Sequence, residues 1–172
     1  AEREVSLNTG AAIANALREY GYTNVVEIDL DPRNFGKQLA ESKAEVVFNA
    51  VHGLYGEDGR LQTLLEIREM PYTGSGMIAS VSCMDKVITK RMLRDAGIST
   101  PACLIVNKKE SGIKEKIMQR FSLPVVIKPA SQGSSIGVEI VKEEKQLDEA
   151  LANAFKYSRD ILVEEFIGGK EL

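Results

Sequence analysis

The sequence has no tryptophan, one histidine (His52) and two cysteines, Cys83 and Cys103. Two cysteines cannot build a disulfide framework, and no Cys-x-x-Cys pair or Cys/His cluster indicates a zinc site. The single histidine excludes, within this chain, any site that needs two, such as the zinc-protease helix motif. We therefore expect a protein of a reducing cytoplasm.

Long apolar runs and a basic charge excess are also absent. No apolar run reaches the roughly 18 residues of a membrane span, and the start Ala1-Glu2-Arg3-Glu4 lacks the apolar stretch of a signal peptide. The net charge of −3 and the pI near 5.4 provide no field that attracts a nucleic-acid backbone or an anionic membrane. We expect partners that are neither membranes nor nucleic acids.

With 172 residues, of which 44% are hydrophobic and 27% charged, the chain has the composition of a globular protein with one large or two small domains. Its first part alternates helical and strand patterns. The spacing predicts strands over 25–28 and 46–48, a helix over 35–44 and another after Gly59. The first helix has an apolar stripe of Val5, Ala12, Ile13, Ala16, Leu17 and Tyr20. A parallel α/β layer is the expected architecture.

The second part has strand patterns at 103–106, 125–127, 138–141 and 161–165, with helical patterns at 113–120 and 147–155. A further helix is predicted over 85–96, with Ile88, Met92 and Ala96 facing inward. This mixture predicts an α+β domain. We place the boundary at this helix, which gives domains 1–84 and 85–172.

A serine- and glycine-rich segment, 131–137, lies between two of these strand patterns. Its backbone N–H groups and hydroxyls suit a phosphate, although an ordinary flexible hairpin has the same composition. Lys128 ends an apolar strand, where a charge is costly unless it faces an anion or solvent. Lys86 begins a helix and would supply a second cation, but a lysine there is more often only solvated.

Two further segments follow buried strands. Glu164, Glu165, Phe166 and Ile167 combine acidic, aromatic and aliphatic residues that would suit a flat base, or form a plain strand exit. The loop 52–59, which contains His52, lies at the strand edge where α/β sheets bind ligands, although a lone histidine is commonly structural.

Two motif matches fail in context. Gly133-x-Ser135-x-Gly137 fits a hydrolase nucleophile elbow, but a strand pattern follows it where the elbow needs a helix, and no histidine lies downstream. Gly74-x-Gly76-x-x-Ala79 resembles a dinucleotide fingerprint, yet the acid expected some 20 residues later, Asp95, falls in a predicted helix. No Walker-type phosphate loop is present, so an ATP site would need another fold.

Taken in order along the chain, the motifs resemble those of the D-alanine–D-alanine ligase family of the ATP-grasp superfamily. The similarity spans essentially the whole chain. The segments that carry it are Ala1-Glu2-Arg3-Glu4-Val5-Ser6-Leu7-Asn8, His52-Gly53 with Gly56-Glu57-Asp58-Gly59, Pro71-Tyr72-Thr73-Gly74-Ser75-Gly76, Met84-Asp85-Lys86, Val126-Ile127-Lys128-Pro129, Gly133-Ser134-Ser135-Ile136-Gly137 and Val163-Glu164-Glu165-Phe166-Ile167.

The resemblance implies a Rossmann-like, parallel-sheet N-terminal domain, followed by the α+β central subdomain that forms the first part of the ATP-grasp fold. It also implies the roles of individual residues. Lys86 and Lys128 would bind ATP phosphates, and a loop containing Ser131, Gly133, Ser134 and Ser135 would cover them. Adenine would lie at Glu164, Glu165, Phe166 and Ile167, and the ribose at Glu171. Glu2 and His52 would hold the first D-alanine, and Ser134 would orient the second.

The implied activity joins two D-alanines through an acyl phosphate, for peptidoglycan synthesis in the cytoplasm. Members of the family also have a first strand and a C-terminal part with Mg²⁺ (or Mn²⁺) ligands, which this chain lacks, so no metal ligand is expected here. We expect the chain alone to be inactive and the full-length protein to be a homodimer. A D-alanine–D-lactate ligase, another ATP-grasp carboxylate–amine ligase and a noncatalytic nucleotide-binding fragment remain alternatives.

Overall fold

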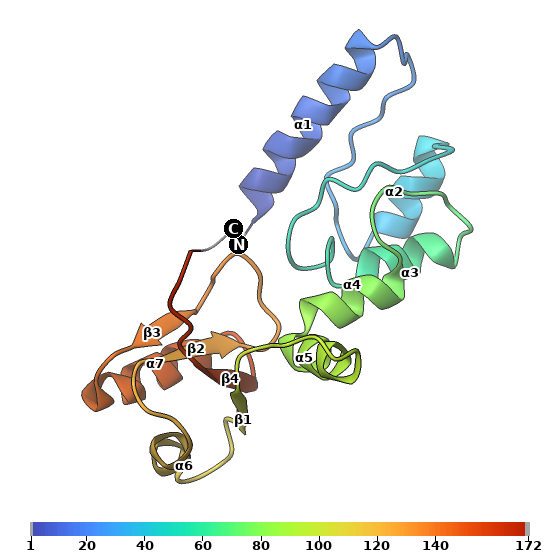
Figure 1. Cartoon of the computed structure of the whole chain (residues 1–172). Coiled ribbons are helices and arrows are strands. Elements are labelled where there is room, and N and C mark those ends of the chain that lie inside the picture. Colours follow the sequence, from blue (N-terminus) through green and yellow to red (C-terminus); the bar gives the residue numbers. More distant parts are fainter. Residues whose placement is uncertain (1, 171–172) are drawn as a thin grey trace. The chain divides into compact units, whose positions relative to one another are not determined.

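The computed structural model describes residues 2–170 and divides into two compact units, Ala1–Val81 and Ser82–Leu172 (Figure 1). Each unit is described by itself. The first contains α1 (Arg3–Glu19), α2 (Phe35–Ser42), α3 (Arg60–Glu66) and most of α4 (Met77–Met84). The second contains α5 (Lys86–Asp95), α6 (Ile113–Arg120), a short 3-10 turn η1 (Glu144–Gln146), α7 (Leu147–Ala154) and the four strands of one sheet.

A small apolar cluster forms the core of the first unit. Phe35 and Leu39 of α2 pack with Leu61 and Leu65 of α3. These residues repeat at i, i+4 in both helices, so each helix presents one narrow apolar stripe to the other. The helices predicted over 35–44 and after Gly59 are confirmed, whereas α4 was not predicted.

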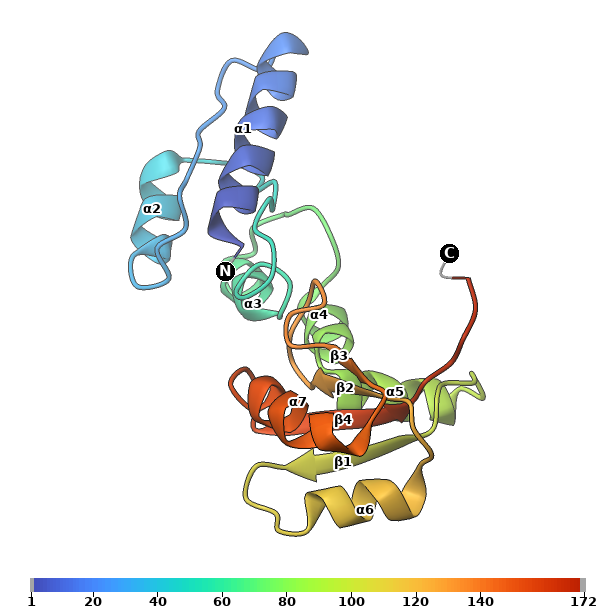
Figure 2. The same cartoon turned by 90° about the vertical axis from the view of Figure 1, so that its left-hand side faces the viewer.

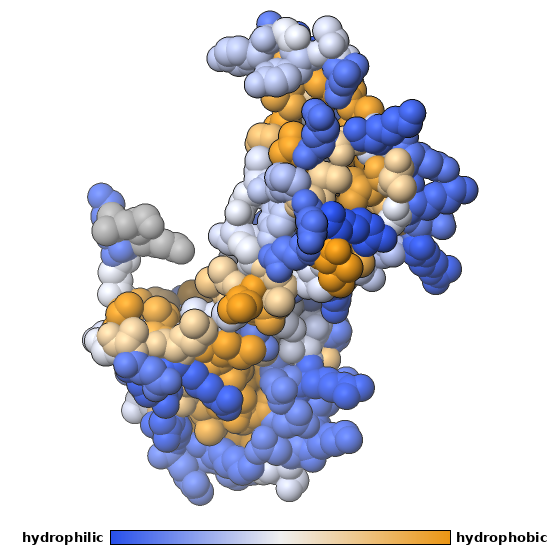
Figure 3. Space-filling model, turned by 90° about the vertical axis from the view of Figure 1, so that its right-hand side faces the viewer, coloured by the Kyte–Doolittle hydropathy of each residue, from blue (hydrophilic) through white to orange (hydrophobic). Residues whose placement is uncertain are grey.

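The parallel sheet expected in this unit is reduced to one bridge among the described residues. Val47 pairs with Tyr72 in parallel: its N–H donates to Pro71 O at 2.9 Å, and its carbonyl accepts from Thr73 N–H at 3.0 Å. The strand prediction for 25–28 is therefore wrong, and that for 46–48 is confirmed only as the bridge at Val47. An apolar run becomes a strand only where a neighbouring segment satisfies its backbone groups. Apolar residues remain at the surface of this unit (Figure 3), among them Val26, Val46 and Phe48.

The predicted helix over the first residues forms as α1, but its apolar stripe does not all face inward. Val5 is 54% exposed and Tyr20 is 87% exposed, while Ala14 is buried. The inner face instead carries the partly buried polar residues Ser6 and Thr9. Their hydroxyls contact the loop of His52, as described below.

The second unit contains an antiparallel sheet of four strands in the order β1-β4-β2-β3. The strands are β1 (Cys103–Asn107), β2 (Val125–Pro129), β3 (Glu139–Val141) and β4 (Asp160–Glu165). All four were predicted within two residues at each end, and α6 has the predicted bounds. The α+β prediction for this part is confirmed.

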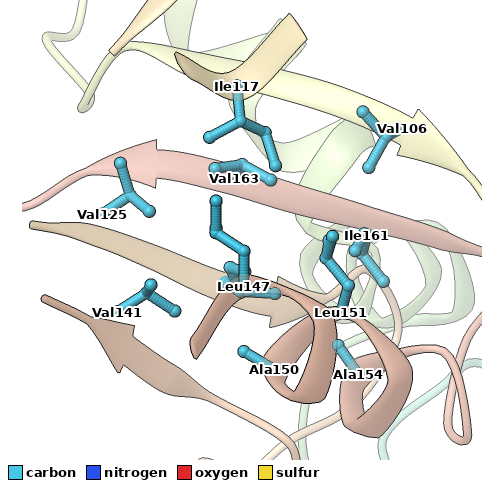
Figure 4. Close-up of a cluster of buried hydrophobic side chains, with 11 residues drawn as sticks. Val106, Ile117, Val125, Val141, Leu147, Ala150, Leu151, Ala154, Ile161 and Val163 are labelled. Carbon is cyan, nitrogen blue, oxygen red and sulfur yellow. The ribbon is translucent and has the colours of Figure 1, made fainter. Parts of the chain in front are cut away.

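The main core lies between one face of this sheet and the helices α6 and α7 (Figures 2 and 4). Alternate strand residues such as Val125, Ile127, Ile161 and Val163 point to this face and are fully buried. From α7, the residues Leu147, Ala150, Leu151 and Ala154 pack against them at offsets 0, 3, 4 and 7. The strand residues between these point to the other face of the sheet, and Lys128 and Glu164 are among them.

The helix predicted over 85–96 forms as α5, but its predicted inner face is wrong. Ile88, Met92 and Ala96 are exposed, whereas Lys90 is buried with 7% of its surface exposed. Asp85 caps the helix, since its carboxylate accepts from the N–H groups of Val87 and Ile88 at 2.8 and 3.0 Å. The packed face of α5 is thus selected by a buried ion pair rather than by apolar periodicity.

Ile117 and Met118 are adjacent in α6, and they allow a matched test of this core. Ile117 is fully buried and Met118 is 38% exposed. We predict that Ile117→Ala lowers the unfolding free energy of the second unit by about 2–5 kcal/mol, and that Met118→Ala lowers it by less than about 1 kcal/mol. Urea unfolding followed by circular dichroism would measure both. Equal losses would contradict the packing described.

Candidate functional site

A buried carboxylate joins two lysines on the face of the second unit's sheet that is opposite to α6 and α7. Val126 is opposite Glu164 and Lys128 is opposite Leu162 in the pairing of β2 with β4, so Lys128 and Glu164 are diagonal neighbours on one face. Lys128 Nζ forms an ion pair with Glu164 Oε2, and Lys90 Nζ of α5 lies 2.6 Å from Glu164 Oε1. Both carboxylate oxygens are therefore engaged.

Glu164 is only 4% exposed, which makes its charge depend on these partners. Burial alone would raise the pKa of Glu164, but the hydrogen bonds and charges of Lys128 and Lys90 outweigh it and lower that pKa. The carboxylate is therefore ionised at neutral pH. The backbone of Glu164 is paired with both neighbouring strands, and its two carboxylate oxygens are each engaged by a lysine.

Lys86 belongs to the same cluster. Its backbone N–H donates to Ala130 O at 2.9 Å, and its Nζ donates to Gln132 O, at the start of the serine–glycine loop. Burial lowers the pKa of Lys86, and the positive charge of Lys128 lowers it further, while Asp85 and Glu164 oppose both effects. Lys86 and Lys128, which the sequence predicts to act together, are therefore close enough to repel each other.

The loop between β2 and β3 forms a flap of two successive turns. Ile136 N–H donates to Gly133 O at 3.1 Å, and Val138 N–H donates to Ser135 O at 3.1 Å. Ser134 and Ser135 have φ values of 49° and 57°, in the left-handed region that non-glycine residues seldom adopt. Ser131, Ser134 and Ser135 are exposed. β3 follows the flap, so the nucleophile-elbow reading is also excluded by the structure.

The segment after β4 presents an apolar edge. Glu165 is held to the segment before β1, because its N–H donates to Ala102 O at 3.1 Å and its Oε1 accepts from Ala102 N–H at 2.7 Å. Phe166 and Ile167 follow the strand and are 42% and 63% exposed. Of the four residues predicted to bind a base, Glu165, Phe166 and Ile167 follow one another at this edge. The side chain of the fourth, Glu164, faces the lysines instead. Glu171 lies outside the described residues.

The first unit brings Glu2 and His52 together around Gly53. A Cβ built on Gly53, whose φ is +67°, would lie 1.8 Å from Glu2 Oε2, so the carboxylate lies directly over this glycine. Ser6 connects the two segments: its hydroxyl donates to Glu2 O at 2.9 Å and accepts from His52 N–H at 2.9 Å.

The imidazole of His52 is held on both sides. Its Nε2 lies 3.0 Å from Thr9 Oγ1, and its Nδ1 lies 3.6 Å from Glu57 Oε1. Such partners restrict the ring orientation. Sequence reasoning did not assign roles to Ser6 or Thr9, although their i, i+3 spacing places both on one face of α1.

Lys90 is the other residue that the sequence prediction missed. It lies four residues after Lys86 in α5, so the two lysines are on the same helical face. That spacing was the available signal.

Within residues 2–170, no group of three or more His, Cys, Asp or Glu side chains is placed to hold a metal ion. Across that same range, no helix combines the length and the apolar composition that crossing a bilayer requires.

Two glycines of the flap allow a matched test of its conformation. A Cβ on Gly137, whose φ is +71°, would lie 2.8 Å from both Pro129 Cγ and the Tyr157 ring, whereas a Cβ on Gly133 would meet no atom within 4 Å. We predict that Gly137→Ala lowers the unfolding free energy by about 1–3 kcal/mol, and that Gly133→Ala changes it by less than about 0.5 kcal/mol. Urea titration of each variant would show whether the flap has this shape, which equal effects would rule out.

Comparisons with known proteins agree on one family. The model described as "D-ala D-ala ligase N-terminus" matches residues 30–75, and that described as "D-ala D-ala ligase C-terminus" matches residues 92–172. The D-alanine–D-alanine ligase of Carboxydothermus hydrogenoformans is 46% identical over 175 residues, covering 99% of this chain and 55% of the relative. That of Geotalea uraniireducens is 45% identical over 172 residues, covering 100% of this chain and 54% of the relative.

Solved structures extend the similarity to the fold. The D-alanine–D-alanine ligase of Bacillus anthracis is 37% identical with a TM-score of 0.85, and the match covers 98% of this chain and 55% of that one. The VanG D-Ala:D-Ser ligase of Enterococcus faecalis is 36% identical with a TM-score of 0.69, covering 74% and 37%. The chain thus spans little more than half the length of the relatives it matches. With two family models and these relatives in agreement, the chain belongs to the D-alanine–D-alanine ligase family.

Proposed function

We propose that this chain supplies the first amino-acid site and the nucleotide-binding subdomain of an ATP-dependent D-alanine–D-alanine ligase. The observation that carries the proposal is the cluster of Lys86 and Lys128 at the base of the serine–glycine flap. Partly desolvated cations beside free backbone and hydroxyl donors are suited to a polyphosphate. The names of the relatives support the same activity.

The proposed domains are residues 1–84 for substrate binding and residues 85–172 for nucleotide binding. The two family models fit this division, since one matches 30–75 and the other 92–172. The contact-based division after Val81 lies three residues before the proposed boundary.

In the nucleotide site, Lys86 and Lys128 would bind the phosphates, and Ser131, Gly133, Ser134 and Ser135 would cover them. Phe166 and Ile167, exposed after β4, would provide an apolar surface and backbone groups for adenine, with Glu165 beside them. Glu164 is also predicted to contact adenine, and in the folded chain its carboxylate holds Lys128 and Lys90. Glu171 would reach the ribose.

In the first unit, Glu2 would receive the ammonium of the first D-alanine, with His52 beside it. A carboxylate and an ammonium form strong charge-assisted hydrogen bonds. The contacts of Ser6 and Gly53 support this role because they fix Glu2 and His52 next to each other. Ser134, exposed on the flap, would orient the second amino acid.

The proposed reaction has two steps. The carboxylate of one D-alanine attacks the terminal phosphorus of ATP and forms an acyl phosphate with release of ADP. The amine of the second D-alanine then attacks the acyl carbon, loses a proton and expels phosphate. The lysines would offset the charge that grows on the phosphates, and the flap would exclude water. This activity would serve peptidoglycan synthesis in the cytoplasm, with the complete protein acting as a homodimer.

Magnesium (or manganese) would accompany ATP in such an enzyme. The described residues do not fit a metal site, because no three or more of their His, Cys, Asp or Glu side chains are grouped so that they could hold a metal ion. We therefore propose that its ligands come from outside this chain, and we derive no step from it. The second substrate is also open: the match to a D-Ala:D-Ser ligase makes D-serine, and by extension D-lactate, a second candidate.

Substitution of the two phosphate lysines tests the proposal directly. In the complete protein encoded by the gene, Lys86→Met and Lys128→Met should each weaken ATP binding at least about tenfold, because each removes a cation from a partly desolvated site. Lys142→Met, at an exposed lysine that follows β3, should leave ATP affinity within about twofold of the original. Calorimetric titration provides the measurement. Unchanged affinity in both cluster variants would refute the proposal.

The chain by itself provides a second test. We predict that residues 1–172 alone release no ADP in response to D-alanine, because the described part has no group of three metal-ligating side chains and the chain spans about half of the relative from Carboxydothermus hydrogenoformans. A coupled ADP assay with and without D-alanine measures this, and the complete protein is the positive control. D-alanine-dependent ADP release from the 172-residue chain would overturn this prediction.

A further inference from the structure

Lys90 is a buried lysine that the proposed function leaves without a role. It is 7% exposed, and its Nζ is held by Glu164 Oε1 at 2.6 Å and by Pro101 O at 2.8 Å. Burying an ammonium group is costly unless it is fully paired. Replacing it with an apolar residue would fill the same space without that cost, so the charge itself requires an explanation.

We propose that Lys90 is a positioning residue for nucleotide binding, which keeps Lys128 charged toward the phosphates by sharing the carboxylate of Glu164. This inference rests on the proposed nucleotide site. Glu164 presents one oxygen to each lysine, so neither lysine receives its whole charge. Lys128 is held in place by Glu164 but is not neutralised by it.

The net charge of the cluster supports the proposal that Lys90 keeps Lys128 charged toward the phosphates. Lys90, Lys128 and Glu164 together carry two positive charges and one negative charge, so the group has a net charge of +1. Without Lys90, the remaining pair would be neutral, and the free oxygen of Glu164 would draw Lys128 away from the ligand. Lys86 would then be the main cation facing the phosphates, with Asp85 at its own helix end.

A purely structural role is the alternative. Lys90 joins α5 to Pro101, and the adjacent Ala102 is hydrogen-bonded to Glu165, so the lysine could simply tie the helix to the sheet. A structural tie and a charge balance predict different results when Glu164 is also neutralised. The tie is lost in both cases, whereas the net charge is restored only in the double variant.

Four variants of the complete protein separate these roles, with ATP affinity measured by calorimetry and stability by urea unfolding. Lys90→Met should weaken ATP binding about tenfold, which corresponds to about 1.4 kcal/mol. The double variant Lys90→Met/Glu164→Gln restores the net charge of +1 and should return to within about threefold of the original affinity. Lys90→Arg should keep that affinity, and Glu164→Gln, which leaves both lysines without their carboxylate, should be less stable than the original.

Two results would overturn the inference: unchanged ATP affinity in Lys90→Met, or a double variant as weak as Lys90→Met. If Lys90→Met does not fold, the double variant is compared with Glu164→Gln. Glu164→Gln keeps Lys90 and so has one more positive charge than the double variant, and it should bind ATP about tenfold more tightly than the double variant does. Equal ATP affinity of these two variants would also overturn the inference. Lys86→Met separates this outcome from failure of the proposed function. If Lys86→Met also binds normally, the nucleotide site itself is wrongly assigned.

Discussion

The ionised carboxylate of Glu164, buried between Lys90 and Lys128, determines how the second unit is arranged. It comes from β4, while its partners come from α5 and β2, so one group joins three elements on the face of the sheet opposite to α6 and α7. Buried ion pairs often add little net stability compared with apolar residues. Their consequence here is geometric: the shared carboxylate holds α5 and Lys128 where the flap begins.

The sequence predicted the strands of the second unit better than those of the first, and the reason is physical. The strands of the second unit pair with one another within residues 103–165, so the apolar runs Val125–Ile127 and Ile161–Val163 coincide with real ladders. In the first unit, Val25–Ile28 has a similar pattern but no ladder among the described residues, and Val47 finds only Tyr72. A pattern records which residues prefer burial, but it does not record whether a partner strand is present.

The sequence predicted those residues of the candidate site whose chemical type is unusual at their position in the chain. Lys128 at the end of an apolar strand and the serine–glycine flap were recognisable because such residues are unusual in those places. Lys90 was not, because a lysine in the middle of a helix is normally solvated, and Ile88 and Met92 indicated the wrong inner face. The role of Glu164 required coordinates, since its motif does not reveal that both oxygens are already bound.

The cluster also explains how the proposed polyphosphate site can remain folded before its ligand binds. Burial makes it costly to charge Lys86, and repulsion by Lys128 adds to that cost, which is why the pKa of Lys86 is lowered. Glu164 acts as an internal counter-ion that offsets part of this repulsion, while Lys90 prevents it from cancelling the charge of Lys128. A bound polyphosphate would relieve the remaining repulsion, so part of its binding free energy would come from a cost already present in the folded protein.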